Sequence, residues 1–205
     1  MIFSRINALA AIVVLLISAC AIWSLAHTGP RAPAARHSSA YNSAARKIDF
    51  LASNARRQPP QPTTTILTAD EVNAYLAEGG VELPAGVEQV RFSSVPAVVN
   101  AAARIDFDKL TAGRPMNPFM AALFSGVHDV AVEAQVAGSN GMGSVRTQSV
   151  TIDGVKVPRT ALQFLVDHYL KPKYGTAVGL DTTFRLPARI ETAVVGNNQV
   201  SLTQR

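Results

Sequence analysis

Residues 99–108 read VNAAARIDFD, and residues 128–136 read HDVAVEAQV. In both stretches apolar residues alternate with polar or small ones, which is the pattern of a strand with one buried face. The apolar positions of the first stretch are Val99, Ala101, Ala103, Ile105 and Phe107. The two stretches therefore predict an antiparallel sheet that packs one face on a core and leaves the other face in solvent.

The residues around these stretches predict further strands. A weaker strand over 87–95 ends at Pro96, and the glycine-rich turn 138–143 leads into a returning strand over 144–153. A long strand over 183–195 and a short strand over 199–203 are joined by the turn 196–198.

Helices are predicted between the strands. Thr68 and Glu71 have the spacing of a capping box, so a helix should start there and run to about Glu78. Apolar residues at helical spacing predict helices over 41–57 and 159–170, and Pro172 should end the latter. Residues 117–124 read NPFMAALF and predict a short apolar helix or a covering segment. The fold class is therefore α+β, an antiparallel meander packed on two or three helices.

The N-terminus carries an apolar run. Residues 8–26, ALAAIVVLLISACAIWSLA, approach the length of a helix that crosses a bilayer. Three alternatives fit: an uncleaved anchor, a lipoprotein signal in which Cys20 is lipidated, and a signal peptide cleaved after Ala26. We expect residues 1–27 to be a membrane anchor or signal segment, 28–62 a basic, Pro-rich tether with a short helix, and 63–205 the α+β domain.

The charge distribution argues against nucleic-acid binding. The formal net charge is +5, but residues 1–60 hold seven basic residues against Asp49 alone. Residues 61–205 hold 12 basic and 13 acidic residues, so the expected domain is nearly neutral. The basic residues near the apolar run suit anionic lipid headgroups, and we expect a membrane partner and no nucleic acid.

No cluster of residues marks an enzyme or a metal site. His128 and His168 are 40 residues apart with no second histidine at ligand spacing, and Cys20 is the one cysteine of the chain. The Gly138–Gly143 loop joins two predicted strands, whereas a phosphate-binding loop precedes a helix. Asp106, Asp108, Asp129 and Glu133 fall in the polar register of strands, where a solvated face is expected. We therefore predict a non-catalytic protein with no cofactor and no metal.

Two dense groups of apolar residues remain. One lies on the predicted helix 159–170 and the other around residues 117–124. Core packing explains such stripes, and a groove for acyl chains between sheet and helix is the alternative. The candidate groove residues are Leu162, Leu165, Val166, Tyr169, Phe119, Phe124 and Phe107.

Three segments together resemble a known group of proteins. These are LTADEVNAYL at 67–76, ARIDFD at 103–108 and IDGVKVP at 152–158. Their order and spacing are similar to those of the bacterial TULIP-like and SIMPL-like families of anchored or periplasmic proteins. The resemblance implies a curved antiparallel sheet that wraps a helix, and binding of phospholipid or another amphiphile in an apolar groove.

The leading hypothesis is therefore a single-pass, membrane-tethered domain on the outer side of the cell membrane that binds lipid. The alternative is a structural or assembly accessory that binds another envelope protein through a sheet edge.

Overall fold

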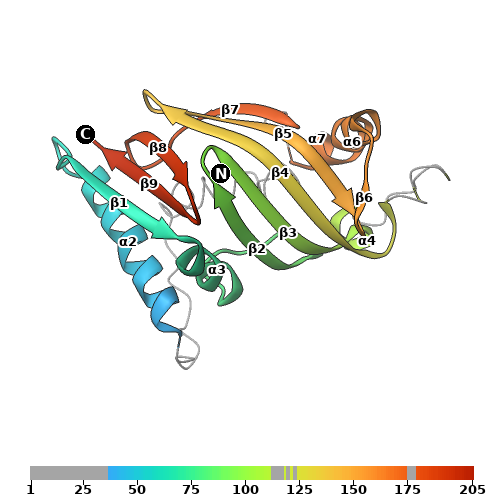
Figure 1. The fold of residues 1–205 in the computed structure, drawn as a ribbon, viewed down its shortest axis with the longest axis horizontal. Helices are drawn as coiled ribbons and strands as arrows, with labels where there is room; N and C mark the ends of the chain where they lie inside the picture. The colour runs from blue at the N-terminus through green and yellow to red at the C-terminus, as the bar shows by residue number, and fades with distance from the viewer. Residues whose placement is uncertain (1–36, 112–117, 119–120, 122–123, 175–178) are drawn as a thin grey trace.

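The computed structural model describes residues 37–205 except 112–117, 119–120, 122–123 and 175–178. The described residues are mainly an antiparallel sheet with a few helices, so the predicted α+β class is confirmed. The strands are β1 (Thr63–Thr68), β2 (Val87–Val95), β3 (Val98–Asp106), β4 (Val127–Ser139), β5 (Met142–Ile152), β6 (Val155–Lys156), β7 (Asp181–Arg185), β8 (Ile190–Gly196) and β9 (Gln199–Gln204). Figure 1 shows how they are arranged.

The sheet has a central meander and a lateral extension. Strands β2, β3, β4 and β5 pair in sequence order, and β5 also pairs with β6 and β7. The extension is β8, β9 and β1, joined to the meander where Ala193 of β8 pairs with Gly138 of β4. The last strand therefore lies between β8 and β1, the first strand of the described chain.

The meander has an inner face on the core and an outer face. Val99, Ala101, Ala103 and Ile105 of β3 are at most 5% exposed, as the alternation predicts. On β4 the alternation continues through Val130, Val132, Ala134 and Val136, which are all buried. The side of the meander that carries these buried residues is its inner face, and the opposite side is its outer face.

The helices flank the two ends of the sheet. They are α2 (Ser39–Ala55), α3 (Ala69–Ala77), α4 (Phe107–Thr111), α6 (Arg159–Leu165), the π-helix η1 (Val166–Leu170) and α7 (Lys171–Tyr174). Helices α2 and α3 lie at the end formed by β1 and β9, whereas α6 and α7 lie at the opposite end of the molecule (Figure 1).

Helix α2 packs against the extension. The predicted helix is present, and its residues Ile48 and Leu51 are 5% and 0% exposed. They belong to a core cluster that also contains Leu67 of β1 and Leu202 of β9. The buried Asn54 amide donates to the Gln204 side chain at 3.0 Å, so α2 is also fixed to the last strand by hydrogen bonds.

Pro172 does not act as the sequence predicts. Pro172 was expected to end a helix, but α7 continues through it to Tyr174. The wide η1 turn precedes it, with Lys171 N–H donating to Val166 O, and this turn relieves the clash of the proline ring with the preceding carbonyls.

The predicted strand over 183–195 is wrong as one element. It is divided into β7 and β8 because Pro187 has no amide proton for a ladder bond. Ala188 and Arg189 then have φ values of 50° and 53°, which no strand accommodates.

Candidate functional site

The structure brings most of the predicted groove residues together. Leu162 and Leu165 on α6, Val166 on η1, Phe107 on α4 and Phe124 share one core cluster with the inner face of the meander. Each of the five is at most 4% exposed, and Tyr169 packs against them half-buried. We call these six side chains the apolar layer. Phe119 and the possible lipidation site Cys20 lie outside the described residues.

Aromatic contacts tie the apolar layer to the end of the sheet. The rings of Phe107 and Phe124 meet edge to face with centroids 5.5 Å apart. The Phe107 ring also lies 6.1 Å from the ring of His128, at the start of β4. The layer is therefore continuous from α6 to the first residues of β4.

The surface of the helix opposite the apolar layer is polar. Asp167 accepts from Gln163 at 2.9 Å and pairs with Lys171 at 2.6 Å. The hydrogen bond from Lys171, with that from Gln163, holds the pKa of Asp167 below its usual value. His168 stacks on Phe164 with centroids 4.0 Å apart. The η1 segment is therefore amphipathic, with Val166 and Leu170 as its buried residues.

His128 and Asp153 form a close pair beside the apolar layer. His128 Nδ1 lies 2.6 Å from Asp153 Oδ2, and His128 Nε2 lies 2.7 Å from the carbonyl oxygen of Ser125. The bond to Asp153 raises the pKa of His128, and the Ser125 carbonyl adds to this rise, while partial burial opposes it. Because both ring nitrogens face acceptors, the ring acts as a donor that ties β4 to the turn after β5. It has no free nitrogen for use as a base.

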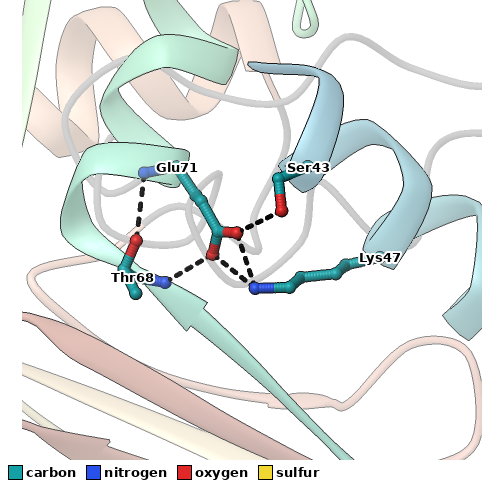
Figure 2. A network of polar contacts seen from close by, with 4 residues as sticks. All are labelled: Ser43, Lys47, Thr68 and Glu71. Atoms are coloured by element: carbon teal, nitrogen blue, oxygen red, sulfur yellow. Dashed lines mark hydrogen bonds and ion pairs between the residues drawn. The ribbon is translucent and has the colours of Figure 1, made fainter. Parts of the chain in front are cut away.

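The most buried carboxylate joins α2 to α3 (Figure 2). Glu71 Oε1 accepts from Ser43 Oγ and Lys47 Nζ, both at 2.6 Å. Glu71 Oε2 accepts from Thr68 N at 2.9 Å, which completes the predicted capping box. Burial alone raises the pKa of Glu71, but the bonds from Lys47, Ser43 and Thr68 outweigh it and lower that pKa. Every oxygen of this carboxylate therefore has a structural partner.

The outer face of the meander holds a hollow that the sequence analysis missed. It has a volume of about 420 Å³ and extends from Asn73 of α3 across β2, β3 and β4 to β5. Arg91, Asn100 and Glu133 stand around it, and Ala102 and Ala131 lie between them. The alternation in the sequence places these residues on the outer face, but only the strand register shows that they are neighbours. We call this feature the outer hollow.

Two kinds of site are absent from the part of the chain that the structure describes. Within it, no three His, Cys, Asp or Glu side chains converge as a metal site. None of its helices combines the length and the apolar character that a membrane crossing requires.

Comparisons with protein-family models, with curated proteins and with solved structures find no match to this chain. Within the described α+β fold, the apolar layer and the outer hollow are the two candidate functional features.

Proposed function

We propose that this chain is a membrane-tethered, non-catalytic domain that binds a lipid or another amphiphile at the apolar layer. In this proposal residues 8–26 hold the protein in the cell membrane, and the folded domain lies on the outer side. The observation that carries the proposal is the π-helical turn η1, which interrupts the amphipathic helix that contributes Leu162, Leu165 and Val166 to the layer.

A π-helical turn is rare and is found frequently at functional sites. Its backbone bonds close wider rings than those of an α-helix, so the helix on either side can shift with little loss of hydrogen bonding. Here the turn lies between Leu165 and Lys171, and its side chains Val166 and Leu170 are at most 1% exposed. A shift at η1 therefore moves apolar side chains relative to the inner face of the sheet.

The described residues of the layer are closely packed, so in this proposal an acyl chain enters when the helix formed by α6 and η1 moves away from the inner face of the sheet. Each buried methylene contributes about 0.8 kcal/mol, which allows a long chain to replace the contacts that separation loses. The polar outer side of η1, with its Asp167–Lys171 pair, stays in water during such a movement.

Native mass spectrometry of the full chain, extracted from membranes in mild detergent, tests the proposal. We expect an adduct with the mass of a lipid on the wild-type protein. Replacement of Leu165 by Trp fills the layer, so the adduct should be lost. The matched variant Leu202→Trp changes the other core cluster and should keep it.

Overpacking costs about 1–3 kcal/mol, so both variants should melt lower. If either variant does not fold, the smaller change to Phe at the same position replaces it. Absence of a lipid adduct from the wild-type protein contradicts the proposal, as does an adduct that persists in the Leu165 variant.

A second function is favoured by one specific observation. Strand β1, TTTILT, carries no charge and pairs only with β9 among the described strands. An uncharged edge strand rich in β-branched residues can pair with a strand of another protein. If this is the function, the same mass spectra should show a protein partner and no lipid.

A further inference from the structure

We propose that the outer hollow is a binding site for a small zwitterion, a molecule that carries an ammonium group together with a carboxylate or phosphate. The hollow lies on the face of the meander opposite the apolar layer. This inference therefore stands independently of the lipid proposal.

The strand register builds the hollow from two rows of residues across four strands. The first row is Arg91, Ala102, Ala131 and Thr151, and the second is Ser93, Asn100, Glu133 and Ser149. All eight residues line the hollow. Its volume of about 420 Å³ is within the range of small-molecule sites, about 300–1,000 Å³.

The two alanines create the space. Ala102 and Ala131 are exposed and pair with each other in the middle of the first row. Alanine is disfavoured in strands, and an exposed position usually carries a longer polar or β-branched side chain. The alanines leave the floor low between Arg91 at one end of the row and Thr151 at the other.

The charged groups around this floor are available to a ligand. Within the described chain, Arg91 and Glu133 form no ion pair with each other or with another residue. They stand on β2 and β4 and are two residues apart in register. Two strand steps of ~4.8 Å, combined with two residues of ~3.4 Å along the strand, therefore keep their backbones roughly 12 Å apart. A guanidinium and a carboxylate held apart in this way complement an oxyanion and an ammonium in one molecule.

The uncharged groups complete the set of hydrogen-bond partners. Asn100 stands beside Glu133 in the second row, and its carboxamide can both donate and accept. The hydroxyl groups of Ser149 and Thr151 line the β5 side of the hollow. They can bind the polar atoms that connect the two charges of the ligand.

Isothermal titration calorimetry of the full chain in mild detergent tests this inference with two probes. Glycylglycine supplies an ammonium and a carboxylate, and O-phosphoethanolamine supplies an ammonium and a phosphate. We expect saturable binding of at least one probe, and the one that binds identifies the anionic group. N-acetylglycylglycine and ethanolamine, which each lack one charge, should bind at least tenfold more weakly.

Variants locate the binding. Ala131→Thr fills the hollow and suits a strand better than alanine, so it should lower affinity at least tenfold without lowering Tm. Ala137→Thr is the matched control, because Ala137 is exposed on the same strand and does not line the hollow. Arg91→Gln should also weaken binding, whereas Arg104→Gln, outside the hollow, should not.

The inference is overturned if neither probe gives saturable heat, or if the analogues that lack one charge bind as well as the zwitterions. It is equally overturned if the Ala131→Thr protein binds like the wild type. None of these results depends on whether a lipid adduct is found on the other face.

Discussion

Replacement of Glu71 by alanine removes the carboxylate that joins α2 to α3. The Thr68 amide and the Ser43 hydroxyl lose an acceptor, and Lys47 loses two hydrogen bonds of 2.6 and 2.8 Å. The Lys47 side chain is 34% exposed and can turn to water, so its desolvation is largely recovered. Loss of a helix cap costs about 0.5–2 kcal/mol, and loss of a hydrogen bond to a charged group about 1.5–3 kcal/mol. The contributions are not additive, and we expect a total of about 2–4 kcal/mol.

Thermal unfolding followed by circular dichroism measures this loss. At roughly 2–4 °C per kcal/mol for a domain of this size, Tm should fall by about 5–15 °C. The pKa of Glu71 is lowered in the folded state, so its contribution is present above its unfolded value of about 4.5 and is lost as pH falls through the folded value. The difference between Glu71→Gln and the wild type should therefore shrink in acid.

The exposed neighbour Asp70 provides the control for Glu71. It lies in the same first helical turn, so Asp70→Asn removes a charge near the helix N-terminus without touching α2. A double-mutant cycle with Lys47→Ala isolates the contact between the helices. If Glu71→Ala costs no more than Asp70→Asn, the carboxylate does not join the helices in the way described.

Two further predictions concern the sheet. His128→Gln should lower Tm at pH 6, and the effect should fade toward pH 9: the Asp153 carboxylate raises the pKa of His128, so the contribution is complete below about 6.5 and is lost as pH rises through the folded value. An equal effect at both pH values, measured by the same melts, would contradict this. Asn73 donates to Phe92 O at 3.0 Å and accepts from Phe92 N at 2.6 Å. Asn73→Ala should therefore lower stability by about 1–3 kcal/mol and open the edge of β2, seen as self-association in sedimentation velocity; a monomer of unchanged Tm would refute it.

The sequence predicted those elements for which a local residue pattern is compatible with only one structure. The alternation over 99–106 has a single strand register that buries Ile105 and exposes Arg104, and the structure follows it. The last two residues of the predicted stretch, Phe107 and Asp108, instead begin helix α4. The hairpin between β4 and β5 was also predictable, because Asn140 and Gly141 adopt the positive φ angles, 52° and 71°, that this dipeptide tolerates best. The capping box at Thr68 depends only on residues three apart.

Other features depend on contacts that are distant in the chain. Helix continuation through Pro172 required the π-helical turn before it, which no local pattern marks. The outer hollow forms because Ala102 pairs with Ala131, 29 positions away. Alternation along each strand does not show which residues of two strands lie opposite each other, so the hollow could not be predicted. The candidate site was thus predictable as a set of apolar helix residues, but its relation to the opposite face of the sheet was not.

The packing of α2 changes the geometry of membrane attachment. Residues 28–62 are predicted to be a tether with a short helix, and that helix, α2, starts at Ser39. Just before it, Ser38 N and His37 Nδ1 hydrogen bond to Glu78 at 2.9 and 3.2 Å. If residues 8–26 cross the membrane, about ten residues remain before the fold, which can span at most ~35 Å. The chain enters the domain at the α2 end, whereas α6 and the apolar layer lie at the far end of the molecule (Figure 1). If the apolar layer binds a lipid as proposed, the domain must lie along the membrane or another carrier must deliver the lipid. A domain upright on its tether would hold the layer away from its own bilayer.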